Sequence, residues 1–194
     1  MRYKAPRGTR DILPEDTWKW QEVERIFRAT ADRFGYPEIR LPVFEETDLF
    51  TRGIGDSTDI VRKEMYTFED RKGRSLTLRP EGTAGVVRAY IEHSMGRAAR
   101  TTKLSYFCPM FRYERPQAGR YRQFWQWGLE AIGSLSPGVD AEIIHFCTSL
   151  FADLGIAGVV ARLNSAGCRE CTPAYNERLR ERLASRLDEF CEDC

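Results

Sequence analysis

The chain has 194 residues, of which 42% are hydrophobic, 30% charged and 12% aromatic, and its formal net charge is +1. This composition is that of a soluble globular protein, with no internal repeat or low-complexity segment. The near-neutral charge argues against a protein that grips nucleic acid by bulk electrostatics alone, so any phosphate chemistry has to be local. No apolar run reaches the ~20 residues that cross a bilayer, and no apolar segment follows the basic N-terminus. We therefore expect a cytoplasmic protein.

The N-terminal region is predicted to form a helix and an edge strand. In residues 15–34 the apolar side chains recur on one helical face, and Gly35 supplies a C-terminal stop. The segment PEIRLPVFE, residues 37–45, alternates apolar and polar side chains as a half-buried strand does. Pro42 cannot donate to a strand ladder, which limits this segment to an edge or irregular strand.

The middle of the chain is predicted to contain two hairpins and two helices. In chain order these are a hairpin of Met65–Phe68 with Ser75–Leu78, a helix from Thr83 to about Met95, a hairpin of Tyr106–Glu114 with Gln123–Ile132, and a helix at residues 140–154 capped by Asp140. Strands that come as hairpins with flanking helices indicate an α+β fold around an antiparallel sheet. Neither a GxGxxG nor a GxxxxGK[ST] sequence is present, so Rossmann or P-loop nucleotide binding is unsupported.

The C-terminal stretch differs from the rest in composition. Residues 158–164 are predicted to form a short strand, and from Pro173 onward the pattern is helical and strongly charged. A boundary near residues 164–167 divides the chain into 1–166 and 167–194.

The six cysteines are expected to be reduced thiols or metal ligands in the cytoplasm. Four of them form a CxxC-x19-CxxC pattern that fits a four-thiolate zinc site, namely Cys168, Cys171, Cys191 and Cys194. If residues 173–190 form one straight helix, the two pairs stand about 27 Å apart and cannot share an ion. A break near Ala184 and Ser185 would remove this objection. Zinc is not favoured over unligated thiols on a helical insertion.

The longer hairpin is predicted to be apolar on one face and polar on the other. Alternation places Arg112 and Glu114 on the polar face of the first strand, and Gln126, Gly128 and Glu130 on that of the second. Gly128 removes a side chain between Gln126 and Glu130, whose Cα atoms should lie about 13 Å apart. This leaves a slot for a small polar molecule. The alternative is a solvated face with incidental ion pairs.

Arginines are concentrated around this hairpin. A planar guanidinium binds phosphate through two parallel hydrogen bonds and offsets charge that develops on phosphorus, which suits Arg112. Three further arginines could reach other phosphates or a nucleic-acid end, or serve only solubility, namely Arg115, Arg120 and Arg122.

Two segments carry a family resemblance. TLRPEGT (77–83) followed by FRYERPQAGRYRQFWQ (111–126) resembles the bacterial histidyl-tRNA synthetases, which are class II aminoacyl-tRNA synthetases. The longer hairpin resembles class II motif 2, and the helix from Glu15 with the strand carrying Pro42 resembles motif 1. The similarity runs over essentially the whole chain in one unbroken order.

This resemblance implies a fold, a reaction and partners. The family has an antiparallel catalytic sheet flanked by helices and forms a homodimer through motif 1. Its enzymes activate L-histidine with ATP and Mg²⁺ to histidyl-adenylate, then transfer it to histidine tRNA. Residues 1–166 would be the catalytic core, and residues 167–194 the start of a helical insertion domain.

The resemblance also implies which residues bind the amino acid. The histidine-binding set is Glu81, Gly82, Thr83, Arg112, Gln126 and Glu130. Glu81 and Thr83 would hold the α-amino group, and Glu130 would pair with the imidazole. A carboxylate suits an imidazole because it accepts the ring N–H and favours the protonated ring.

A second set would bind ATP. Arg112 would be the catalytic residue that holds the α-phosphate, while Glu114 and Arg120 would help to seat the nucleotide. No metal-ligating residue is implied.

Two departures from the family pattern stand out. Trp125 replaces the usual histidine, and alternation puts it on the apolar face, which indicates repacking rather than loss of the pocket. The chain also stops at Cys194, within the expected insertion domain and before class II motif 3 and the anticodon-binding domain. We expect a fragment of a longer protein that is inactive alone.

Two other functions remain open. A histidine-binding regulatory paralogue of ATP phosphoribosyltransferase would need the amino-acid pocket but no phosphate clamp, so the presence of Arg112 favours the enzyme. A pseudo-synthetase that senses RNA or amino acids is less favoured, because the chain has no basic run.

Overall fold

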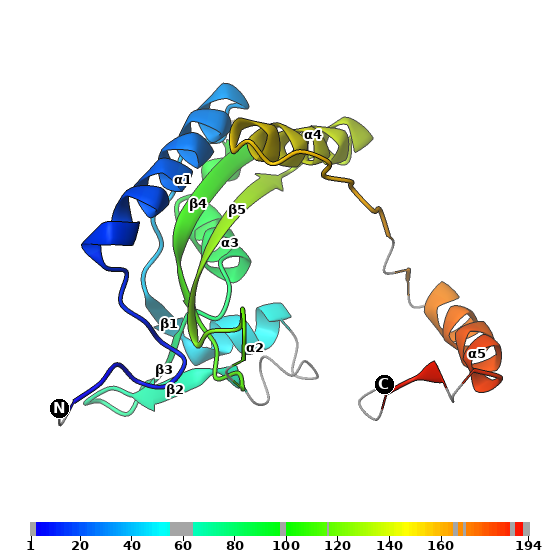
Figure 1. The fold of residues 1–194 in the computed structure, drawn as a ribbon, viewed down its shortest axis with the longest axis horizontal. Coiled ribbons are helices and arrows are strands. Elements are labelled where there is room, and N and C mark those ends of the chain that lie inside the picture. The colour runs from blue at the N-terminus through cyan, green and yellow to red at the C-terminus, as the bar shows by residue number, and fades with distance from the viewer. Residues whose placement is uncertain are drawn as a thin grey trace. The chain divides into compact units, whose positions relative to one another are not determined.

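The computed structural model describes residues 3–54, 64–97, 100–115, 117–164, 167–168, 170–186 and 189–191. The chain divides into two compact units, Met1–Val159 and Val160–Cys194. The described strands all belong to the first unit (Figure 1).

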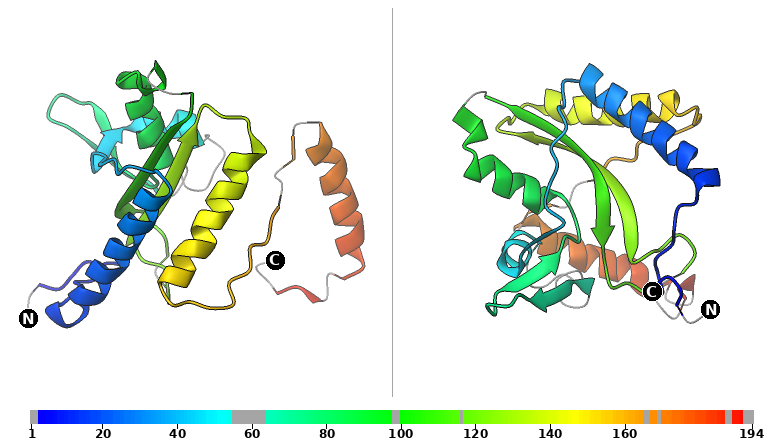
Figure 2. Two further views of the ribbon diagram at one scale, coloured as in Figure 1. Left: turned by 90° about the horizontal axis from the view of Figure 1, so that it is seen from above. Right: turned by 90° about the vertical axis from the view of Figure 1, so that its left-hand side faces the viewer.

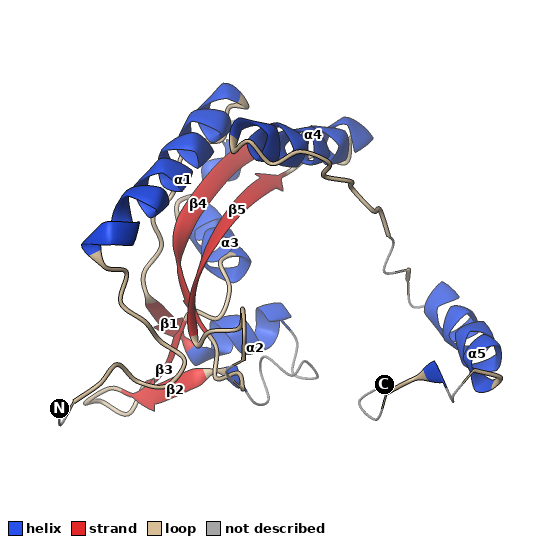
Figure 3. Ribbon diagram, in the orientation of Figure 1, coloured by secondary structure: helices blue, strands red, loops and turns tan. Residues whose placement is uncertain are grey.

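The elements confirm the predicted α+β class with antiparallel strands (Figure 3). They are α1 (Pro14–Arg33), β1 (Phe44–Glu46), α2 (Thr47–Ile54), β2 (Tyr66–Glu69), β3 (Ser75–Leu78), α3 (Thr83–Glu92), the 3₁₀ turn η2 (Met95–Arg97), β4 (Thr102–Phe111), β5 (Gln123–Ile132), α4 (Pro137–Asp153) and α5 (Cys171–Ala184). Among the described helices, none combines the length and the apolar character that a membrane crossing requires.

The long hairpin β4–β5 organises the first unit. Its register runs from the pair Thr102↔Ile132 to the pair Phe111↔Gln123. Helices α1 and α4 cover one face (Figure 2), where a buried cluster consists of Phe27, Ala31, Tyr36, Phe146 and Leu150. The strand side chains that pack against this cluster are Phe107, Trp127, Leu129 and Ala131, which confirms the predicted apolar face.

The opposite face is only partly polar, which corrects the prediction. A second buried cluster lies there, formed by Val86, Leu104, Tyr106 and Met110. Val86 belongs to α3, so this helix packs on the face that carries the predicted site residues. The polar part is therefore a small area between apolar residues rather than a whole strand face.

The short strands form a separate antiparallel sheet in the order β1-β3-β2. The hairpin β2–β3 matches its predicted limits to within one residue, and Gly73 adopts a φ of 75° in its turn. The segment after β3 leads directly into α3 and positions residues 80–83 beside β5.

The predicted strand at residues 37–45 is mostly irregular. Only Glu38 bridges to Ser105, and regular pairing begins at Phe44 in β1. The physical reason lies in Pro37 and Pro42, which have no N–H to donate to a ladder.

Arg79 hydrogen-bonds the carbonyl groups that this irregular segment leaves without strand partners. Its side chain is 4% exposed. Nη1 donates to the carbonyl oxygens of Leu41 at 2.8 Å and Pro42 at 3.0 Å, and Nε donates to that of Pro109 at 2.8 Å. A buried guanidinium thereby joins three backbone segments next to residues 80–83.

Helices α2 and α4 also differ from the prediction. Helix α2 was not predicted, because its eight residues are too short for a clear periodic pattern. Helix α4 begins at Pro137 rather than Asp140. Its N-cap is Ser136, whose hydroxyl accepts a hydrogen bond from Gly138 N–H at 3.2 Å.

One C-terminal prediction was wrong, and the predicted helix is present. Residues 158–164 form no strand, and they are exposed. Helix α5 begins at Cys171, two residues before the predicted start at Pro173, and it ends at Ala184, where the alternative to one straight helix placed a break.

Candidate active site

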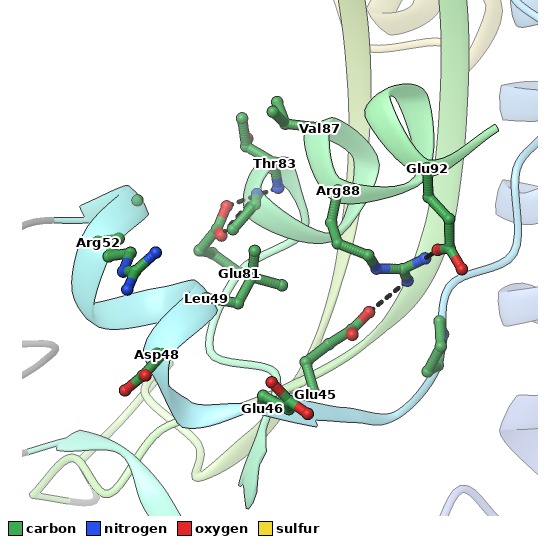
Figure 4. Close-up of a pocket in the computed structure, with 13 residues that line it drawn as sticks. Glu45, Glu46, Asp48, Leu49, Arg52, Glu81, Thr83, Val87, Arg88 and Glu92 are labelled. Carbon is green, nitrogen blue, oxygen red and sulfur yellow. Dashed lines mark hydrogen bonds and ion pairs between the residues drawn. The ribbon is translucent and has the colours of Figure 1, made fainter. Parts of the chain in front are cut away.

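Polar side chains meet where the N-terminus of α3 contacts β5. Thr83 Oγ1 donates a hydrogen bond to Glu130 Oε1 at 2.7 Å. The carboxylate of Glu81 accepts from the backbone N–H groups of Thr83 at 2.6 Å and Ala84 at 2.9 Å (Figure 4). Thr83 therefore contacts both of the acids that the sequence assigned to one site.

The position of Glu81 follows from the start of α3. The N-cap is Gly82, which has no side chain to bond the free N–H groups of the first turn. Glu81 bonds them instead, and the positive end of the helix dipole favours its negative charge. A carboxylate has about four acceptor sites, so it keeps capacity for a bound cation.

Burial and like charge raise the pKa of Glu130. Desolvation is the largest cause, the hydrogen bond from Thr83 opposes it, and the negative charge of Glu81 raises the pKa further. The carboxylates of Glu81 and Glu130 repel each other when both are charged and partly buried, and a bound cation would offset that repulsion.

Gln126 supplies an acceptor without a partner. It lies on the same face of β5 as Glu130, opposite Cys108 of β4. In the described part of the chain its Oε1 atom is buried and accepts no hydrogen bond. Because such an atom costs free energy, a ligand N–H placed here would gain a ready acceptor.

Arg112 lies just beyond β4 rather than inside it, so the predicted strand to Glu114 is too long. Its Nε donates to the carbonyl oxygen of Pro80 at 2.8 Å, and its guanidinium lies 5.2 Å from the centre of the Phe124 ring. These contacts fix Arg112 beside the residue that precedes Glu81. A guanidinium has five N–H groups, so others remain for a phosphate.

Glu114 lies between two arginines. Its Oε1 is 3.9 Å from Arg112 Nη1, and its Oε2 is 3.9 Å from Arg120 Nη1. Arg120 is largely exposed at the hairpin loop, with a side-chain exposed fraction of 65%. Glu114 therefore separates two positively charged side chains.

The expected open slot over Gly128 is filled, which corrects the prediction. Tyr106 is paired with Gly128 across the hairpin. A Cβ atom added to Gly128 would lie 2.2 Å from Cζ of Tyr106. Tyr106 was not among the predicted site residues. The strand register, which pairs an aromatic side chain with a glycine, is the signal that could have found it.

A cavity of about 1140 Å³ adjoins one edge of this cluster (Figure 4). Glu81 and Thr83 line it, together with residues of β1, α2 and α3. Arg88 crosses its wall and pairs with both Glu45 and Glu92. Of the predicted site residues only Glu81 and Thr83 are among its lining, so this cavity is not the predicted pocket itself.

Trp125 lies on the apolar face of the hairpin, as predicted. Its ring stacks on Phe107 with centroids 5.2 Å apart and contacts Trp20 of α1 at 5.9 Å. It therefore belongs to the packing between β5 and α1, on the face opposite Gln126 and Glu130.

The described residues do not bring together a zinc site. They contain no group of three or more His, Cys, Asp or Glu side chains that could hold a metal, and Cys194 lies outside them. The end of α5 at Ala184 removes the long-helix objection. Cys171 Sγ accepts a hydrogen bond from Cys168 N–H at 2.9 Å, and the contacts with Cys171 lower the pKa of the Cys168 thiol.

Comparison with known proteins gives a consistent result. A family model described as histidyl-tRNA synthetase matches residues 8–187. The histidine–tRNA ligase of Bacillus subtilis (strain 168) is 54% identical over 195 residues, which cover 100% of this chain and 46% of that protein. The histidine–tRNA ligase of Geobacillus sp. (strain WCH70) is 55% identical with the same coverage.

Solved structures agree. The apo histidyl-tRNA synthetase of S. aureus superposes with a TM-score of 0.74 and 44% identity, over 99% of this chain and 45% of that one. A Bacillus halodurans protein described as an ATP phosphoribosyltransferase regulatory subunit/histidyl-tRNA synthetase gives a TM-score of 0.69 and 25% identity. It covers 81% of this chain and 39% of its own, so it is the more distant relative.

The fold that holds this cluster is that of the class II aminoacyl-tRNA synthetases. Within that class, the chain belongs to the histidyl-tRNA synthetase family. It spans about 46% of the length of the curated relatives it matches.

Proposed function

We propose that this chain is the motif 1 and motif 2 portion of a histidine–tRNA ligase. The complete protein would activate L-histidine with ATP to histidyl-adenylate and transfer it to histidine tRNA in the cytoplasm. The observation that carries the proposal is the contact of Thr83 with both Glu81 and Glu130, beside an arginine held by Pro80. It gathers groups for an amino acid and a phosphate in one place.

Each end of histidine has a matching group in this proposal. Glu81 and Thr83 would bind the α-ammonium, with the free Oε1 of Gln126 as a further acceptor. Glu130 would accept an imidazole N–H, and the approach of that donor would offset the desolvation that raises the pKa of Glu130. Gly82 would keep the backbone between these groups free of side-chain bulk.

Arg112 would act on the reacting phosphate. As the histidine carboxylate attacks the α-phosphorus of ATP, negative charge builds on the phosphate oxygens and pyrophosphate leaves. The guanidinium, fixed by the Pro80 carbonyl and the Phe124 ring, is already oriented to offset that charge. Glu114 and Arg120 would hold the rest of the nucleotide.

Magnesium would enter with ATP. Mg²⁺ is usually bound by substrate phosphates and one or two carboxylates rather than by a cage of protein ligands. Glu114 would supply such a carboxylate at the nucleotide end of the proposed site.

A homodimer through the motif 1 region is also proposed. Three large apolar side chains of this region are exposed in the single chain, with exposed fractions of 61% at Trp18, 44% at Val43 and 50% at Phe44. A second copy packed on them would remove this area from water. Sedimentation equilibrium of the complete gene product should give twice the chain mass, and a monomer at micromolar concentration would reject the dimer.

Histidine-dependent exchange of pyrophosphate into ATP tests the main proposal. The assay is run on the product of the complete gene, because the chain spans 46% of its relatives. Exchange that requires histidine and disappears in Arg112→Ala is the expected result. Histidine binding by calorimetry without exchange would instead support the regulatory-subunit alternative. Absence of both in folded protein would reject the proposal.

A further inference from the structure

Tyr106 is the buried ionisable group at the site that the proposed mechanism has not used. It lies in the middle of β4 with 3% of its surface exposed, and it is paired with Gly128 of β5. Its ring turns toward the polar cluster rather than toward α1 and α4, because it shares a face with Leu104 and Met110.

Two glycines from different elements make room for the tip of this ring. A Cβ atom on Gly128 would lie 2.2 Å from Cζ of Tyr106, and one on Gly82 would lie 2.4 Å from the same atom. Neither glycine has the left-handed φ that would require glycine for backbone reasons; φ of Gly82 is −103°. Both positions need glycine because the Tyr106 ring occupies the space between α3 and β5.

The hydroxyl end of the ring adjoins the proposed histidine-binding groups, because a Cβ atom on Gly82, between Glu81 and Thr83, would lie 2.7 Å from Tyr106 Oη. Burial raises the pKa of Tyr106 most, and the charges of Glu130 and Glu81 raise it further, while Thr83 opposes them. The phenol therefore stays protonated at neutral pH. A neutral O–H next to two carboxylates is a donor that is available at all times.

We propose that Tyr106 is a positioning residue of the histidine site. Its ring, held between Gly82 and Gly128, sets the floor of the site. Its hydroxyl keeps the Thr83–Glu130 pair in the orientation that receives the imidazole ring. This inference rests on the proposed function and deepens it, because it adds Tyr106 to the residues that would shape the histidine site.

The first test compares Tyr106→Phe with a matched control in the complete gene product. Tyr36→Phe is the control, because Tyr36 is also buried and donates to a glutamate, Glu142, at 2.8 Å, but on the opposite face of the hairpin. Tyr106→Phe keeps the ring and removes one hydroxyl. It should raise KM for histidine about tenfold and leave KM for ATP within about twofold. Tyr36→Phe should lower the unfolding temperature and leave both KM values unchanged.

The second test measures whether the ring and the glycine are coupled. Gly128→Ala alone should lower the unfolding temperature, because its Cβ collides with the ring. In a protein that already carries Tyr106→Leu, Gly128→Ala should lower the unfolding temperature much less, because the tip of the tyrosine ring is absent. Additive effects of the two changes would overturn the proposed contact.

The outcomes separate this inference from the proposed function. If the unaltered protein shows histidine-dependent exchange and Tyr106→Phe keeps the same KM for histidine, the role of Tyr106 is overturned and the proposed function stands. If the unaltered, folded protein shows no exchange, the proposed function and the inference that depends on it are both overturned.

Discussion

The hydroxyl of Thr83 donates to the carboxylate of Glu130 at 2.7 Å, across an interval of 47 residues. This contact joins the first residue of α3 to β5 and brings the TLRPEGT segment to the long hairpin. Because the two segments are remote in the sequence, it is the fold that brings their residues together into one candidate site.

Replacing Thr83 by valine removes this donor at nearly constant volume. Because the Thr83 hydrogen bond lowers the pKa of Glu130 against the effect of burial, its loss should raise that pKa and reduce the fraction of carboxylate at neutral pH. We expect KM for histidine to rise about tenfold in the exchange assay. Thr148→Val, whose hydroxyl bonds only a carbonyl oxygen of its own helix α4, should leave KM unchanged. Equal KM values for Thr83→Val and unaltered protein would contradict this role.

The raised pKa of Glu130 also predicts how the free energy of unfolding depends on pH. Its folded pKa is raised, so its contribution to the free energy of unfolding is fully present below the ordinary pKa of glutamate and is lost as pH rises through the raised value. The stability of Glu130→Gln relative to the unaltered protein should therefore increase as pH rises from the ordinary pKa of glutamate through the raised value, while the variant loses histidine-dependent exchange. Urea unfolding at several pH values measures the difference.

Glu142 supplies a control because its pKa is shifted in the opposite direction from that of Glu130. Hydrogen bonds from Lys103 and then Tyr36 lower its pKa, so its contribution is present above the ordinary pKa and is lost as pH falls. The stability of Glu142→Gln relative to the unaltered protein should therefore fall as pH rises from below toward the ordinary pKa of glutamate. The same pH trend in both variants would contradict the assignment.

Periodicity in the sequence predicted much of the frame. The alternation in residues 123–132 correctly separated Trp125 and Trp127 from Gln126 and Glu130, because side-chain direction in a strand depends only on position. The position of Tyr106 could not be predicted in the same way. It depends on the register of β4 against β5 and on the approach of α3, which is remote in sequence.

The failures have local causes. The segment at residues 37–45 has the alternation of a strand, but Pro37 and Pro42 cannot donate to a ladder, and Arg79 hydrogen-bonds carbonyl groups of this segment. Residues 158–164 have a strand-like composition and no pairing partner among the described strands. In both segments the sequence pattern reflects which side chains are apolar. Whether a strand forms depends instead on whether the backbone N–H and C=O groups find hydrogen-bond partners on another strand.

Arg79 should be essential to stability. Its guanidinium donates to three carbonyl oxygens and Arg79 is almost fully buried, so Arg79→Ala would remove three hydrogen bonds from a charged donor. We expect a loss of about 3 kcal/mol or more in the free energy of unfolding. Arg40→Ala is the matched surface control, because its side chain is 83% exposed and its pair with Glu38 should contribute at most about 1 kcal/mol. Thermal unfolding of the complete gene product measures both, and equal losses would contradict the role of Arg79.

Trp125 should influence packing and leave the chemistry unchanged. Trp125→His would remove an indole ring that stacks on Phe107 and contacts Trp20, and it would leave the opposite face of β5 untouched. Each aromatic pair contributes about 0.5–1.5 kcal/mol, and Trp125 is 36% exposed, so the free energy of unfolding should fall by about 1–2 kcal/mol. KM for histidine and for ATP should each stay within about twofold, as measured by exchange at 25 °C. A large rise in KM for histidine with unchanged stability would mean that the two faces of the hairpin are coupled, and that Trp125 acts on the pocket through β5.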